Sequence, residues 1–132
     1  MQLALVIALG GALGATARWQ ITQEVARRLP DTAAAWGTFA VNVSGSLVAG
    51  IVAGALLYSN FGEQPLWRGF VLTGFLGGFT TFSAYSLDSV KLIERGEIFN
   101  AALYAVASVV LAIVAAAVGL LIMRNIIPAE RL

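Results

Sequence analysis

The sequence predicts an all-α membrane protein with four transmembrane helices in a single domain, residues 1–132. Three observations support this fold class. Of the 132 residues, 59% are hydrophobic and only 11% are charged, whereas about a quarter of a typical soluble domain is charged. The mean hydropathy is +0.86. Four apolar segments approach or exceed the ~20 residues that a membrane-spanning helix needs.

The first predicted span runs from about Leu3 to about Ile21, with Arg18 near its end. The N-terminus lacks the basic region of a signal peptide, so we expect a permanent helix. The remaining spans are predicted from about Ala34 to Tyr58, from Leu66 to Leu87 and from Ile98 to Met123.

The connectors EVARRLPD, SNFGEQP and DSVKLIERGE carry most of the charges. An even number of spans places both termini on one side of the membrane. That side has Arg68, Arg124 and Arg131, and the other has Arg18, Arg27, Arg28, Lys91 and Arg95. Orientation follows the lysine and arginine bias of short loops. The bias here is weak, so it fixes no orientation and permits insertion both ways.

Glycines recur at a spacing of four residues in three of the spans, as in Gly10 with Gly14. Such pairs let helix backbones approach closely. The same spacing occurs in Gly50 with Gly54 and in Gly74 with Gly78. The pattern fits packing within one bundle and packing between subunits equally well, and either arrangement favours an oligomer.

Two spans carry uncharged polar stripes. The second span has Thr38, Asn42 and Ser46 at four-residue spacing, so they share one helix face. The fourth span has Asn100, Tyr104 and Ser108 at the same spacing. For a single hydroxyl, interhelical hydrogen bonding is the ordinary explanation. Asn42 is different, because a mid-span amide needs several partners and often marks a substrate pathway.

The third span contains GFLGGFTTFSAYS, residues 74–86. Its glycines weaken a helix, and its hydroxyls compete for backbone hydrogen bonds. Non-helical backbone at membrane depth persists only when it is buried in protein or lines a polar cavity. We therefore predict a break in this helix, whose freed carbonyls suit a hard cation. The alternative is a continuous helix packed through its glycines.

Missing residue types narrow the function. The chain has no cysteine and no histidine, and it shows no paired carboxylates, so an enzyme is not expected. The net charge of +1 is scattered, so no nucleic-acid partner is expected. A small proton-coupled multidrug exporter is the alternative function, but no span has the mid-membrane carboxylate that it would use. A structural membrane subunit would not need the polar stripes.

Three motifs resemble the Fluc, or CrcB, family of fluoride-ion channels. They are GGALGATARW at 10–19, GTFAVNVSGS at 37–46 and TGFLGGFTTFSAYS at 73–86. They occur in the expected order and spans, so the resemblance covers essentially the whole chain. It implies a multi-pass protein of the bacterial plasma (inner) membrane that exports fluoride passively. It also implies an antiparallel, dual-topology homodimer in the lipid bilayer, with two fluoride pathways.

The resemblance also implies site residues. A structural sodium ion, Na+, would be held by the backbone carbonyls of Gly77 and Thr80. The implied fluoride pathway comprises Arg18, Thr38, Asn42, Thr81, Phe82, Ser83, Tyr85, Asp88, Tyr104 and Ser108. Two positions depart from the commoner pattern. Tyr85 adds a hydroxyl where phenylalanine is usual, and Asp88 is one methylene shorter than the usual glutamate.

Overall fold

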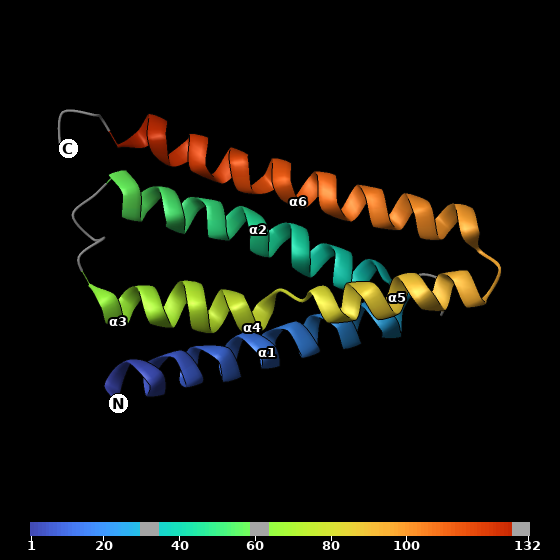
Figure 1. The fold of residues 1–132 in the computed structure, drawn as a ribbon, viewed down its shortest axis with the longest axis horizontal. Coiled ribbons are helices and arrows are strands. Elements are labelled where there is room, and N and C mark those ends of the chain that lie inside the picture. The colour runs from blue at the N-terminus through green and yellow to red at the C-terminus, as the bar shows by residue number, and fades with distance from the viewer. Residues whose placement is uncertain (30–34, 59–63, 128–132) are drawn as a thin grey trace.

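A computed structural model describes residues 1–29, 35–58 and 64–127 as a bundle of four spans (Figure 1). The first is α1 (Gln2–Arg28), the second α2 (Ala35–Tyr58) and the fourth α6 (Ile98–Ile126). The third comprises α3 (Pro65–Arg68), η3 (Gly69–Leu76), α4 (Gly77–Phe79) and α5 (Phe82–Glu94). All four are long and apolar enough to cross a membrane, which confirms the predicted spans. The predicted start at Ala34 and the charge of Arg131 lie outside the described residues.

Two helices run further than the sequence predicts. The first span, expected to end at Ile21, continues to Arg28, and the third, expected to end at Leu87, continues to Glu94. These extensions take in most of the charged segments predicted as connectors. A helix need not end where its apolar run ends, because its last turns can lie near the lipid headgroups, where charged side chains are solvated. In α1, the Glu24 carboxylate pairs at 3.0 Å with Arg27, three residues later, and it also pairs with Arg28, four residues later.

Glycines bring α2 and α6 together along their length (Figure 1). A Cβ added at Gly119 would lie 2.7 Å from the backbone nitrogen of Ile51, and one at Gly54 would lie 2.7 Å from Met123 Cβ. A Cβ at Gly50 would collide with the Ala116 carbonyl. The close approach of these helices therefore depends on the missing side chains.

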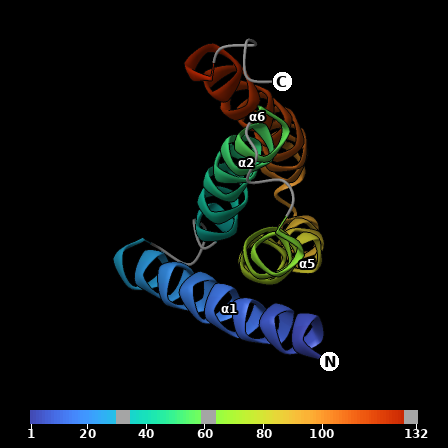
Figure 2. The ribbon, with the colours of Figure 1, turned by 90° about the vertical axis from the view of Figure 1, so that its left-hand side faces the viewer.

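A second glycine contact joins α1 to the third span. A Cβ at Gly10 would lie 2.9 Å from Phe75 N, and one at Gly74 would lie 2.7 Å from the Ile7 carbonyl oxygen. Figure 2 shows α1 on one side of α5, with α2 and α6 on the other. The question that the sequence leaves open is thus answered for these glycine pairs, because they pack within one chain.

The predicted break in the third span is confirmed at Thr80 and Thr81. Both have extended backbone, with φ −81° and ψ 153° at Thr80 and φ −151° and ψ 121° at Thr81. The alternative prediction, a continuous helix packed through its glycines, is therefore wrong. The sequence does not predict the π-helical winding of Gly69–Leu76 that precedes the break. π-helical turns are rare and often lie at functional sites.

Candidate functional site at the helix break

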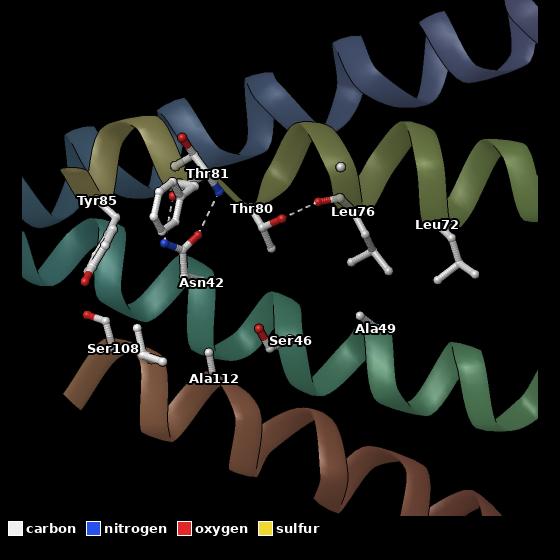
Figure 3. Close-up of a pocket in the computed structure, with 13 residues that line it drawn as sticks. Asn42, Ser46, Ala49, Leu72, Leu76, Thr80, Thr81, Tyr85, Ser108 and Ala112 are labelled. Carbon is white, nitrogen blue, oxygen red and sulfur yellow. Dashed lines mark hydrogen bonds between the residues drawn. The ribbon is translucent and has the colours of Figure 1, made fainter. Parts of the chain in front are cut away.

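Asn42 of α2 holds the extended backbone of Thr81 by two hydrogen bonds. The Asn42 side-chain Nδ2 donates to the Thr81 carbonyl at 2.9 Å, and the Thr81 N–H donates to Asn42 Oδ1 at 2.8 Å (Figure 3). A buried backbone residue outside regular structure needs partners for both its polar groups. An amide carries its donor and its acceptor on two separate atoms, so it can bond both groups at once, which accounts for asparagine at this position.

Side-chain hydrogen bonds at the break leave two backbone carbonyls without their helical donors. In a continuous helix the Thr81 N–H would bond the Gly77 carbonyl, but here it is directed to Asn42. The Ala84 N–H would likewise bond the Thr80 carbonyl, but it donates to the Thr81 hydroxyl at 3.1 Å. The oxygens of Gly77 and Thr80 thereby lose the donors that a helix would give them.

Arg18 of α1 contacts the break from the opposite side. Its Nε donates to the Gly78 carbonyl at 3.1 Å. A cation near the C-terminal end of a helical segment also meets the negative end of its dipole. Arg18 is absent from the residues that line the cavity beside Asn42. In this structure Arg18 therefore lies outside the cavity lining and donates a hydrogen bond to the backbone at the break.

A cavity of about 410 Å³ lies beside the break, between α2, the third span and α6 (Figure 3). Its lining combines apolar side chains with a few hydroxyls and one amide, and none of these described residues is charged. The sequence predicts five of its lining residues as pathway residues and two as cation ligands. The lining residues are Asn42, Ser46, Ala49, Leu72, Leu76, Gly77, Thr80, Thr81, Phe82, Tyr85, Ser108, Val109 and Ala112.

Ser46 is a lining residue that belongs on the predicted site list. It lies one turn beyond Asn42 on the polar face of α2 that helix periodicity identifies in the sequence, although the family resemblance does not single it out. The apolar lining from Leu72 and Leu76 could not be identified in that way. Those residues precede the break in a π-helical segment, whose winding differs from the 3.6-residue period.

Two aromatic residues follow the break. The ring centroids of Phe82 and Tyr85 are 5.2 Å apart, and those of Tyr85 and Tyr104 are 5.6 Å apart. The Tyr85 hydroxyl donates to the Ala105 carbonyl at 3.3 Å, so it is directed to the α6 backbone. Tyr85 therefore contributes its ring to the cavity. Phe82 is 76% exposed in the single chain.

Of the remaining predicted pathway residues, Ser108 lines the cavity, whereas Thr38, Ser83, Asp88 and Tyr104 do not. Tyr104 and Ser108 are 3% and 4% exposed, and among the described residues neither hydroxyl has a hydrogen-bond partner. Thr38 donates to Asp88 Oδ2 at 2.7 Å. Ser83 lies by the break, its hydroxyl 3.1 Å from that of Thr81. Buried hydroxyls without partners are uncommon, and they are suited to a small polar ligand or water.

Together these groups offer two kinds of chemistry. The hydroxyls, the Asn42 amide and the positive edges of aromatic rings suit an anion. The carbonyls of Gly77 and Thr80 suit a cation that prefers oxygen. None of the described residues that line the cavity carries a charge that would bind either ion too firmly to release it.

Comparisons with known proteins show which family the sequence matches. Residues 5–120 match the family model of CrcB-like proteins, described as Camphor Resistance (CrcB). The chain is 52% identical over 122 residues to a fluoride-specific ion channel, FluC 2, of Nitrobacter hamburgensis, covering 92% of this chain and 97% of that protein. It is 47% identical to FluC of Rhizobium leguminosarum bv. trifolii, covering 92% and 95%, and 48% identical to FluC of Rhodopseudomonas palustris, covering 92% and 97%.

Proposed function

Since this chain belongs to the CrcB family, we propose that it is a fluoride channel through which the ion leaves the cell passively. The observation that carries this proposal is the uncharged cavity at the helix break. Its polar lining comes from Asn42, Ser46 and Ser108, and its aromatic lining from Phe82 and Tyr85. Fluoride efflux from liposomes, compared with chloride efflux, tests it.

Neutral donors are suited to conduction of a small, strongly hydrated anion. Such an ion needs replacements for the water that it loses in a narrow pathway. A channel must bind its ion firmly enough to admit it and weakly enough to release it. Hydroxyls, an amide and ring edges meet both requirements, whereas a ring of arginine or lysine would hold the anion more tightly.

We infer that two copies inserted in opposite orientations form the working channel, with two pathways. Two observations support this. Phe82 faces the cavity region yet is 76% exposed in one chain, so a second copy would complete its surroundings. The arginine and lysine bias between the two membrane sides is weak, and dual insertion requires a weak bias.

The proposed sodium site fits the broken backbone. The Gly77 and Thr80 carbonyls would hold the ion, since their helical donors are directed to Asn42 and Thr81 instead. Backbone carbonyls of an unwound membrane helix are suitable sodium ligands. When bound, the cation would supply positive charge that offsets the repulsion of an anion in the low-dielectric membrane.

Replacing Phe82 with isoleucine is expected to slow fluoride efflux from liposomes by about tenfold, because isoleucine fills space without a positive ring edge. Tenfold corresponds to about 1.4 kcal/mol, within the range of aromatic contacts. Phe99→Ile is the matched control, because Phe99 is 79% exposed and does not line the cavity. Equal rates for Phe82→Ile and Phe99→Ile would remove Phe82 from the pathway.

A further inference from the structure

The Asp88 carboxylate has two partners that bind different oxygens. Oδ2 accepts the hydrogen bond from Thr38 at 2.7 Å, and Oδ1 lies 3.7 Å from Lys91 Nζ. The Asp88 side chain is 18% exposed and the Lys91 side chain 63% exposed. Lys91 follows Asp88 by three residues, so both lie on one face of α5. This carboxylate therefore lies between a buried hydroxyl and a solvated ammonium.

The Asp88 carboxylate lies where the polar residues near the cavity meet the surface of the chain. Thr38 precedes Asn42 by one turn of α2. The Tyr104 ring lies beside that of Tyr85, which lines the cavity. Polar groups thus continue from the cavity, through Tyr104 and Thr38, to Asp88 and the exposed Lys91.

We propose that Lys91 is a positioning residue that sets the rate at which anions reach the cavity, by neutralising Asp88. This inference rests on the proposed function. A bare carboxylate at this place would repel fluoride. The two oxygens are instead engaged, one by a hydroxyl and the other by a positive charge. An exposed ion pair adds little stability, so the effect of this pair is expected in ion conduction.

The test is fluoride efflux from liposomes, at low fluoride and low ionic strength, for the wild type and Lys91→Gln. A carboxylate left unneutralised beside the route of an anion is expected to slow efflux by about fivefold, at an effective dielectric constant intermediate between protein and water. Lys91→Arg keeps the charge and is expected to retain the wild-type rate. In an impermeant salt at about 0.15 M, where screening acts over about 8 Å, the difference should shrink.

Two further variants separate this role from general effects. Asp88→Asn combined with Lys91→Gln removes both charges and is expected to conduct faster than Lys91→Gln alone, because the repelling carboxylate is gone. Arg27→Gln removes one positive charge from the end of α1, where Arg27 pairs with Glu24 at 3.0 Å, and is expected to conduct as the wild type does.

Two results would overturn the inference in a wild type that conducts fluoride. One is a Lys91→Gln rate equal to wild type at low ionic strength, and the other is a double variant as slow as Lys91→Gln alone. A wild type without fluoride efflux would instead contradict the proposed function.

Discussion

Replacing Asn42 with alanine is expected to reduce fluoride efflux by about a hundredfold. The variant loses both hydrogen bonds to Thr81, which leaves an N–H and a carbonyl without their partner at membrane depth. Each unsatisfied group costs about 1–3 kcal/mol, so the extended conformation at the break loses its support. The cavity also loses its only amide donor among the described lining residues. A hundredfold change corresponds to about 2.7 kcal/mol.

The matched control is Ser44→Ala on the same helix. The Ser44 hydroxyl bonds the Ala40 carbonyl of its own helix at 2.6 Å and does not line the cavity, so wild-type efflux is expected. Hydrogen exchange at the Thr81 amide reports the structural cause, because its protection should fall in Asn42→Ala and persist in Ser44→Ala. A folded Asn42→Ala protein with wild-type efflux would show that the amide neither holds the break nor lines the pathway.

A second large effect is expected from two adjacent glycines of α1. In Gly10→Ala the new Cβ would lie 2.9 Å from Phe75 N and 3.1 Å from Gly74 Cα. These are backbone atoms and cannot rotate away, so the helices must separate. Overpacking of this kind costs about 1–3 kcal/mol. Gly11→Ala meets nothing closer than the Gly74 carbonyl oxygen at 3.9 Å, and alanine favours a helix by up to about 1 kcal/mol.

Unfolding in detergent, followed by circular dichroism, measures this pair of variants. Gly10→Ala is expected to lower the free energy of unfolding, and Gly11→Ala to leave it unchanged or raise it slightly. Equal stability of the two variants would mean that α1 and the third span do not approach as closely as the structure places them.

The sequence predicts the spans and the break because both follow from local physical chemistry. About 20 apolar residues specify a membrane helix, and Gly77, Gly78, Thr80 and Thr81 weaken one at a definite place. The charged ends of α1 and α5 are missed because hydropathy falls before the helix ends. The last turn of α1 is polar and carries exposed ion pairs such as Glu24 with Arg27, which hydropathy does not register.

Side-chain direction is harder to predict than residue type. The sequence singles out Asn42, but only the fold brings its amide to Thr81, 39 residues away. The sequence singles out Arg18, but only the fold brings its guanidinium to the Gly78 carbonyl, 60 residues away. The Tyr85 hydroxyl donates to the Ala105 carbonyl, and this partner depends on where α6 packs. Each of these contacts is set by how helices pack, which helix periodicity alone does not determine.

Fluoride and chloride efflux from liposomes that contain only this protein tests the proposed function most directly. A potassium ionophore balances the charge, and ion-selective electrodes record each anion. We expect rapid fluoride efflux and far slower chloride efflux, and we expect the fluoride efflux to need no proton gradient. Equal efflux of both anions would contradict a fluoride-specific pathway. Absence of fluoride efflux, together with uptake of a cationic drug driven by a proton gradient, would indicate the multidrug exporter instead.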